Sequence, residues 1–289
     1  MSGPEAIVVT GADGFIGTRL VADLRARGER PVVAVTLEAG FDLARPGWTE
    51  RLPRERADTV VHLAQSFRYR DFPDGARDLF AVNVAAAAEL LEWARLHGAR
   101  RFLLASTGNV YAPAAGRVDE QYPCCPDSFY AATKYSAELL ASRYASFFHV
   151  IRMRLFSVYG PGQRRMLVPD MMARLDEGRE IVLAGGEGLR LTPLYVDDAV
   201  DRIRGLVALE DGAGDECFNL CGEDEATLAE IVSHLGRLMG RAPNVRAAEG
   251  APARLLGDGA RLRGRLGSRP FVPLAEGLAR TVAARKAAD

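Results

Sequence analysis

Three glycines spaced three residues apart follow the first apolar run of the chain. Residues 10–17 read TGADGFIG and lie between a strand-like run and a segment of helical periodicity. A glycine turn between a strand and a helix is typical of phosphate cradles, because unpaired N–H groups and the dipole at the helix N-terminus favour an anion. Gly11 would allow the tight turn, Gly14 the approach of a pyrophosphate, and Gly17 close packing of the helix on the strand.

Apolar runs of strand length alternate with longer segments of helical period through the first half of the chain. Such alternation predicts a parallel sheet with helices on both faces. We therefore expect an α/β fold with a doubly wound, Rossmann-type parallel sheet. The predicted strands are Ala6–Thr10, Pro31–Leu37, Thr59–Ala64, Arg101–Ser106 and His149–Leu155, and the predicted helices are Gly17–Arg27, Leu79–His97 and Phe129–Tyr144.

The rhythm of strands and helices loosens near residue 160, where glycine and proline turn signals cluster. Helical periodicity returns at Val196–Leu209, Leu228–Met239 and Leu274–Lys286. We expect a dinucleotide-binding domain at residues 1–158, with residues 190–212 packed back onto it. Residues 159–289 are expected to form a smaller, mixed substrate-binding region.

The charge balance and the cysteines exclude several classes of protein. The 37 Lys and Arg residues nearly match the 38 Asp and Glu residues, so no basic excess favours a nucleic acid or an anionic membrane. No run of about 18 apolar residues could span a bilayer, and the N-terminal run lacks the pattern of a signal peptide. The four cysteines match no common zinc spacing. These features predict a cytoplasmic protein without a metal site, a nucleic-acid partner or a membrane partner.

A tyrosine and a lysine four residues apart, Tyr130 and Lys134, stand in a predicted helix. Positions i and i+4 share one face of a helix, so the phenol and the ammonium point the same way. An ammonium at ~4 Å in an effective dielectric of ~20 lowers a phenol pKa by roughly three, which suits a general acid/base. Only Lys134 and Lys286 are lysines among the 37 basic residues, which indicates a specific need for lysine at this position.

Hydroxyl side chains end the fourth predicted strand at Ser106 and Thr107. The carboxyl ends of the strands are where a doubly wound sheet presents its site. A hydroxyl at this position is therefore expected to hydrogen-bond a reacting oxygen beside Tyr130. Neither the G-x-S-x-G elbow of a hydrolase nor the H-E-x-x-H motif of a zinc protease occurs, so those classes have no support.

These motifs, in this order, resemble the extended short-chain dehydrogenase/reductase superfamily and, within it, the nucleotide-sugar-modifying NAD-dependent epimerase/dehydratase family. The resemblance covers most of the chain. It also rests on VHLA at Val61–Ala64, NV at Asn83-Val84, RLFSVYGPG at Arg154–Gly162, and GLR leading to YVDD at Gly188–Asp198.

The resemblance implies roles for the residues of each motif. Tyr130 would be the acid/base, Lys134 would lower its pKa and hold the nicotinamide ribose, and Thr107 would take the place of the catalytic Ser/Thr. The residues expected to contact the dinucleotide are Gly11, Asp13, Gly14, Phe15, Ile16, Gly17, Thr36, Asp42, Leu43, Leu63, Ala64, Gln65, Asn83, Ser106, Tyr130, Lys134 and Phe156. The residues expected to contact the substrate are Gln65, Thr107, Asn109, Ser157 and Arg190.

Two departures from the family pattern bear on cofactor and reaction. Family members usually have an acidic residue that contacts the adenosine ribose, and Thr36 stands at that position here. Glu38 is the alternative contact. The choice between NAD and NADP as cofactor therefore stays open. Gly108-Asn109 replaces the Asp-Glu pair that follows the catalytic Thr in 4,6-dehydratases, which argues against that reaction.

Other departures bear on the substrate. Ser157 stands where epimerases often have Asn. The usual second substrate arginine near the C-terminus has no clear counterpart, and Arg254 is the candidate for its place. Cys124 and Cys125 fall in the loop that borders the substrate in this family, either as inert small residues or as a second acid/base.

The leading hypothesis is an NAD(P)-dependent sugar epimerase or oxidoreductase that transfers a hydride at a sugar carbon, C4, of a nucleotide-activated sugar, with Tyr130 as acid/base. One alternative is an NAD(P)H-dependent ketoreductase or dehydrogenase of a sugar or another small carbonyl substrate. The alternative from another class is a non-catalytic dinucleotide-binding sensor or scaffold. Family members commonly dimerise through two long helices, here Asn83–His97 and Phe129–Tyr144, so a homodimer is expected.

Overall fold

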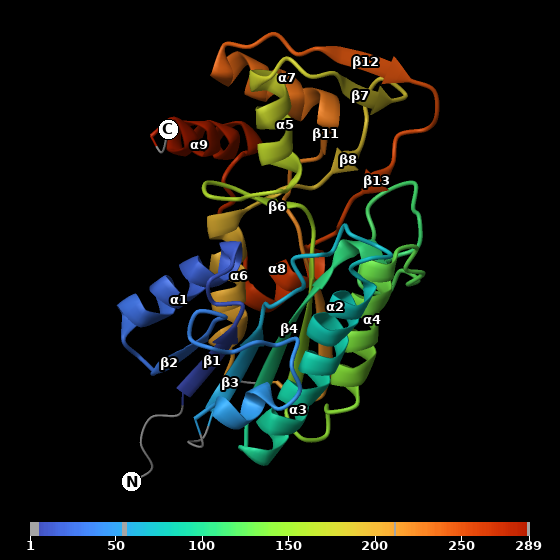
Figure 1. Cartoon of the computed structure of the whole chain (residues 1–289). Helices are drawn as coiled ribbons and strands as arrows, with labels where there is room; N and C mark the ends of the chain where they lie inside the picture. Colours follow the sequence, from blue (N-terminus) through green and yellow to red (C-terminus); the bar gives the residue numbers. More distant parts are fainter. Residues whose placement is uncertain (1–5, 54–56, 211, 288–289) are drawn as a thin grey trace. The chain divides into compact units, whose positions relative to one another are not determined.

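The computed structural model describes residues 6–53, 57–210 and 212–287. The chain forms two compact units (Figure 1). The first unit comprises Met1–Ala112, Pro123–Arg154 and Val200–Phe218, and the second comprises Pro113–Tyr122, Leu155–Ala199 and Asn219–Asp289. The assignment of cofactor binding to residues 1–158 and of substrate binding to residues 159–289 stays a prediction.

A six-stranded sheet forms the centre of the first unit (Figure 1). Its strands are β1 (Ala6–Thr10), β2 (Val32–Val35), β3 (Ala57–His62), β4 (Arg101–Thr107), β5 (His149–Leu155) and β10 (Asp215–Leu220). Their order is β10-β5-β4-β3-β1-β2, and the β1–β2, β1–β3 and β3–β4 pairs are parallel. From β1 the chain adds β2 on one side and then β3 on the other. In doubly wound sheets such a reversal opens a crevice at the carboxyl ends of the strands.

Burial on both faces explains why the central strands are continuous apolar runs. Every residue of β3 and of β4 is buried. On one side of the sheet lie α1 (Phe15–Arg27) and the end of α6 (Val196–Val207), and on the other lie α3 (Ala86–Leu96) and α4 (Phe129–Ser142) (Figure 1). Leu90 and Leu91 of α3 share a buried core with Phe102 of β4. The predicted α/β fold with a Rossmann-type sheet is confirmed.

The predicted helix at Leu79–His97 is a helical segment whose winding changes along its length. It consists of α2 (Ala76–Phe80), a π-helical turn at Ala81–Ala85, and then α3. Buried Asn83 lies inside the π-helical turn. Turns of this kind often occur at functional sites.

The second unit packs short strands against helices around a core of its own. Its strands form a three-stranded sheet of β11 (Ala226–Thr227), β8 (Arg190–Leu191) and β13 (Arg254–Leu255), a pair of β12 (Val245–Ala248) and β7 (Ile181–Ala184), and a pair of β6 (Val158–Tyr159) and β9 (Leu194–Tyr195). Its helices are α5 (Leu167–Asp176), α7 (Leu228–Met239), α8 (Ala260–Leu266), α9 (Leu274–Lys286) and the start of α6. No helix in the described ranges is long and apolar enough to cross a bilayer.

Helix α7 shows how local sequence sets an element's bounds. Thr227 Oγ1 accepts a hydrogen bond from the Glu230 N–H, and the Glu230 carboxylate accepts one from the Thr227 N–H. Gly240 ends the helix with a left-handed φ of 66°. Both α7 and α9 have the predicted bounds, whereas neither α5 nor β10 is predicted by the periodicity.

Candidate active site

The glycine turn lies where the strand order reverses between β1 and β3. Gly11 has a φ of 65°, a left-handed conformation that glycine adopts without strain. A Cβ at this position would lie 2.8 Å from the nitrogen of Ala64, which follows Leu63 at the end of β3. A Cβ on Gly17 would overlap the carbonyl oxygen of Gly11, so this glycine lets α1 start directly against the turn. The close packing of this turn therefore requires glycine at both positions.

The N-terminus of α1 is open to an anion. Gly14 precedes the helix, no side chain caps it, and its first turn holds no acidic residue. Asp13 is exposed, whereas Phe15 and Ile16 are half-buried. The N–H groups of a first helical turn have no intrahelical partner, and the helix dipole adds positive potential there. This end of α1 therefore fits a pyrophosphate.

The carboxyl end of β2 carries no carboxylate at the position expected to meet the adenosine ribose. Thr36 follows the strand, and its hydroxyl accepts a hydrogen bond at 3.0 Å from the N–H of Ala39. Glu38 is exposed in the same turn. Asp42 is half-buried and forms an ion pair with an arginine three residues later, while Leu43 packs against the core.

Tyr130 brings its hydroxyl to the carboxyl ends of β3 and β4. The hydroxyl donates to Gln65 Oε1 at 3.1 Å. It also forms a hydrogen bond with Thr107, the last residue of β4. The ring of Tyr69 lies against the ring of Tyr130, with centroids 5.8 Å apart. The fold thus gathers Tyr130, Thr107 and Gln65 from three separate segments.

Lys134 lies one turn after Tyr130 in α4, and only 3% of its surface is exposed. Within the described ranges its ammonium forms no hydrogen bond or ion pair. Burial lowers the pKa of Lys134 to about 8, and the negative charge of Glu138 acts in the opposite direction. Burial, helped by the charge of Lys134, lowers the pKa of His62 to about 3. His62 is therefore neutral at physiological pH.

The pKa of Tyr130 moves in the direction opposite to the one expected from Lys134 alone. Burial raises the pKa of Tyr130 to about 12, and the hydrogen bond with Thr107 opposes this rise. The phenol is therefore protonated at neutral pH. The prediction from helical spacing considers only the ammonium of Lys134, which lowers the phenol pKa. Burial raises the phenol pKa, because a phenolate is less stable away from water.

Two buried polar side chains flank this region. Asn83 accepts a hydrogen bond from the Ser66 N–H and donates one to Thr133 Oγ1, both at 3.0 Å. Its amide thus links the end of β3 to α4. Ser106 is buried near the end of β4, and its hydroxyl has no hydrogen-bond partner in the part of the chain that the structure describes. This hydroxyl and the Lys134 ammonium are therefore buried donors that are available to a ligand.

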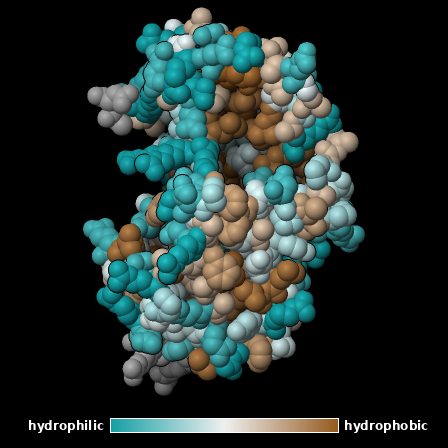
Figure 2. All heavy atoms as spheres, turned by 45° about the vertical axis from the view of Figure 1, so that its right-hand side comes forward, coloured by the Kyte–Doolittle hydropathy of each residue, from teal (hydrophilic) through white to brown (hydrophobic). Residues whose placement is uncertain are grey.

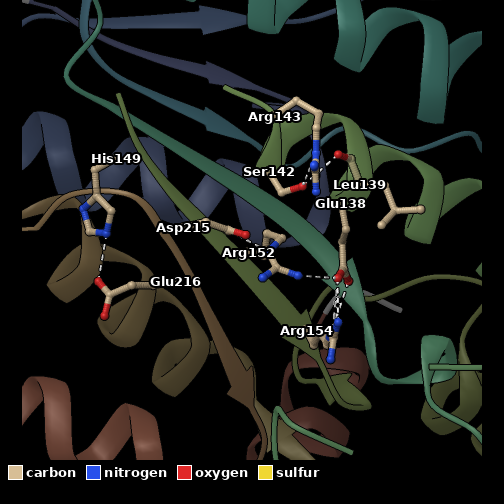
Figure 3. Close-up of polar contacts among 9 residues, drawn as sticks. All are labelled: Glu138, Leu139, Ser142, Arg143, His149, Arg152, Arg154, Asp215 and Glu216. Atoms are coloured by element: carbon tan, nitrogen blue, oxygen red, sulfur yellow. Dashed lines mark hydrogen bonds and ion pairs between the residues drawn. The ribbon is translucent and has the colours of Figure 1, made fainter. Parts of the chain in front are cut away.

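A buried ion pair that no local sequence pattern signals anchors α4 to the sheet. Glu138 lies one turn after Lys134 and accepts hydrogen bonds from Arg154, at 2.7 Å from Nη2 and at 3.1 and 3.2 Å from Nε (Figure 3). Arg152 also donates to Glu138, at 3.3 Å. The guanidinium of Arg154 lies 4.6 Å from the centroid of the Tyr111 ring. The pair holds the Tyr130–Lys134 helix against β5.

Three of the predicted site residues belong to the second unit. Phe156 is completely buried, and Ser157 has a left-handed φ of 43°. Arg190 forms ion pairs with Glu187 at 2.8 Å and with Glu225 at 3.3 Å. Contacts of these residues with a cofactor or a substrate stay predictions.

The remaining candidates have separate surroundings. Cys124 is half-buried and Cys125 exposed, and both are free thiols. Burial raises the pKa of Cys124, which keeps it a thiol at neutral pH and argues against an acid/base role. Asn109 is exposed in the turn after β4. Arg254 donates to the carbonyl oxygen of Ala115, within the second unit.

The pattern of the whole sequence identifies the family. The model of the NAD dependent epimerase/dehydratase family matches residues 7–221, which is more than half of the chain. The chain belongs to this family. It is therefore an enzyme of the NAD-dependent epimerase/dehydratase type, as the resemblance of its motifs predicts.

Similar proteins of this family carry out different reactions. A dTDP-glucose 4,6-dehydratase of Streptomyces griseus is 33% identical over 309 residues, covering 96% of this chain and 93% of the relative. A dTDP-4-dehydro-6-deoxy-D-allose reductase of Streptomyces bikiniensis is 29% identical, covering 87% and 88%. The solved structure of a Thermus thermophilus UDP-glucose 4-epimerase in complex with NAD is 28% identical, with a TM-score of 0.82 over 98% of this chain and all of that one.

Proposed function

We propose that this protein is an NAD(P)-dependent sugar epimerase or oxidoreductase that transfers a hydride at C4 of a nucleotide-activated sugar. The observation that carries the proposal is the hydrogen bond between Tyr130 and Thr107 at the end of β4, with the buried Lys134 one turn after Tyr130 in α4. The similar proteins act on, or are named for, nucleotide-linked sugars, and one was solved with NAD.

In the proposed reaction, some residues of the site bind the dinucleotide and others transfer the proton. The dinucleotide, when bound, supplies the hydride acceptor and donor. The N-terminus of α1 would hold the pyrophosphate of the dinucleotide. Lys134 and Ser106 would donate hydrogen bonds to the dinucleotide. Tyr130 would take the proton of the reacting hydroxyl and return it, while Thr107 would hydrogen-bond the same oxygen. The ammonium of Lys134 would favour the phenolate that this cycle needs.

The turn after Thr107 argues against the dehydratase reaction. The 4,6-dehydratases of this family carry an Asp-Glu pair there. Here Gly108–Val110 form a short 3-10 turn, and the exposed side chain is that of Asn109. An amide does not exchange a proton as a carboxyl group does, so this turn supports epimerisation or simple oxidoreduction.

A homodimer through α3 and α4 is part of the proposal. Figure 2 shows apolar side chains among hydrophilic ones on the face where these helices come forward. The exposed large apolar residues on or beside α2, α3 and α4 are Phe80, Leu96, Leu139, Leu140 and Phe147. An exposed apolar face on neighbouring helices is typical of an association surface. Sedimentation equilibrium would test it, and a monomer at micromolar concentration would contradict it.

The first experiment identifies the cofactor that the protein retains. The protein is purified without added dinucleotide and denatured, and any released dinucleotide is identified by mass spectrometry. Stoichiometric NAD supports an epimerase, because that reaction restores its cofactor in each cycle. An empty protein that binds NADPH or NADH favours the ketoreductase alternative, in which the cofactor must leave after each turnover.

The second experiment tests the reaction and the role of Tyr130. UDP-, dTDP- and GDP-linked sugars are incubated with the enzyme, and inversion or reduction at C4 is followed by proton NMR. Tyr130→Phe should lose about 10²–10⁴-fold in kcat while still binding the dinucleotide. A Tyr130→Phe variant with wild-type turnover would support the sensor or scaffold alternative for the protein.

A further inference from the structure

Gln65 provides the hydrogen-bond acceptor for the hydroxyl of Tyr130. The two side chains meet at 3.1 Å, although they stand 65 positions apart in the sequence. We infer that Gln65 is a positioning residue, whose carboxamide holds the oxygen of Tyr130 in both protonation states that the reaction requires. The inference rests on the proposed role of Tyr130 as acid/base.

The backbone that carries Gln65 is held firmly in place. The next residue, Ser66, donates its N–H to Asn83 Oδ1 at 3.0 Å and its hydroxyl to Asp78. Ser66 Oγ in turn accepts the N–H of Arg68 at 3.0 Å. Gln65 therefore extends from a short segment that is tied at several points to the helices beside it, and its reach towards Tyr130 is restricted.

The same network fixes the other partner. Asn83 donates to Thr133 Oγ1 at 3.0 Å, and the Thr133 hydroxyl donates to the carbonyl oxygen of Tyr130 at 2.8 Å. The ring of Tyr69 packs against that of Tyr130 at an angle of 57°. Asn83 thus links both ends of the Gln65–Tyr130 contact, and Tyr69 limits rotation of the phenol ring.

The chemistry of a carboxamide suits a partner that gains and loses a proton. Its oxygen accepts a hydrogen bond from a neutral phenol, and its NH₂ group donates to a phenolate once the amide turns over. A carboxylate at the same position can only accept and carries a negative charge, and a thioether offers neither function with comparable strength. Gln65→Glu and Gln65→Met keep the length of the side chain and separate these properties.

A titration tests the contact without any substrate. Protein labelled with ¹³C at tyrosine Cζ is titrated from pH 7 to pH 11, and the Tyr130 signal is identified by its loss in Tyr130→Phe. Gln65→Lys should lower the pKa of Tyr130 by about one to three, because an ammonium beside the oxygen favours the phenolate. Exposed Gln121 provides the matched control, and Gln121→Lys should leave this signal unchanged. Equal titration in both lysine variants would overturn the inference.

Turnover tests the role itself. Gln65→Met should lower kcat about tenfold to hundredfold, because the phenol is less well oriented. Gln65→Glu should lower kcat further than Gln65→Met does at the same pH, since a neighbouring negative charge disfavours the phenolate. Gln121→Glu is the control for the added charge.

The outcomes separate this inference from the proposed function. Wild-type kcat in Gln65→Met or in Gln65→Glu would show that the contact has no role in positioning. If the wild-type enzyme turned over no nucleotide sugar, the proposed function would fail, while the ¹³C titration would still decide whether residue 65 lies at the Tyr130 oxygen.

Discussion

Glu138 and Arg154 form an ion pair in the interior of the first unit, with Glu138 Oε2 lying 2.7 Å from Arg154 Nη2. The Glu138 side chain is fully buried and that of Arg154 is 4% exposed. The pair joins α4 to β5 (Figure 3), and Glu138 stands one helical turn after Lys134 in α4. The helix that presents the candidate acid/base therefore depends on a charge pair within the core.

Glu138→Gln should lower the free energy of unfolding by about 3–5 kcal/mol, because it leaves the buried Arg154 cation without its counter-charge. The matched control is Glu92→Gln, which breaks the partly exposed pair of Glu92 with Arg95 and should cost at most about 1 kcal/mol. Urea denaturation of both variants measures the difference. Equal losses would contradict a special role for the buried pair.

Lys134→Met should stabilise the dinucleotide-free protein at pH 7 by up to about 3 kcal/mol, because the folded chain no longer buries an ammonium. The pKa of Lys134 is lowered to about 8 from 10.5. Between those values the unfolded wild-type chain holds a proton that the folded chain has lost, so wild-type stability rises with pH. The advantage of Lys134→Met should therefore shrink from pH 8 to pH 10.5.

The wild type and Lys134→Met are denatured in parallel at each pH. The difference between their free energies of unfolding then excludes the contribution of the other titrating groups, which both proteins share. Lys286, the other lysine of the chain, is exposed and provides the control. Lys286→Met should show a stability difference that does not vary with pH over this range. A constant difference for Lys134→Met as well would mean that the folded protein does not lower the pKa of this lysine.

Ser157→Asn should raise the free energy of unfolding by about 0.5–1 kcal/mol. The φ of Ser157 is 43°, in the left-handed region that Asn adopts more readily than most other residues. Ser157→Val should instead lower stability by about 1–3 kcal/mol, because a branched side chain is strained at this φ. Exposed Ser268 is the control, where Ser268→Asn should change stability by less than about 0.5 kcal/mol.

Thr36→Asp should raise the preference for NAD over NADP at least about tenfold, because a carboxylate hydrogen-bonds the ribose 2′-hydroxyl and repels a 2′-phosphate. Dissociation constants for both dinucleotides, measured by calorimetry, give this ratio directly. Glu38→Gln tests the neighbouring carboxylate in the same turn. A loss of NAD preference in Glu38→Gln, with no effect of Thr36→Asp, would assign the ribose contact to Glu38.

Much of the fold follows from local pattern. The spacing of apolar residues gives β1, β5, α7 and α9 with the bounds that the structure has. Capping residues add to this, since Ser128 accepts the Ala131 N–H at the start of α4. Strand β10 lies outside such reasoning, because its membership of the sheet depends on pairing with β5, more than 60 positions away.

Some residues of the candidate site can be predicted from local sequence, and others only from the tertiary structure. Tyr130 and Lys134 are recognisable from the sequence because helical spacing fixes their common face. The resemblance to the family names Gln65 as a contact of the dinucleotide and the substrate, but its contact with Tyr130 is not predicted, since it needs the strand order that brings β3 to α4. The Glu138–Arg154 pair likewise joins two elements that only packing brings together.

The sequence by itself determined the alternation of strands and helices in the first half of the chain, the glycine turn and the spacing of the acid/base pair, because each depends on residues a few positions apart. Only the tertiary structure decided which side chains meet across the sheet and how deeply each is buried. Burial sets the pKa of Tyr130 to about 12 and that of Lys134 to about 8. These values depend on desolvation by distant segments, which no local pattern of residues contains.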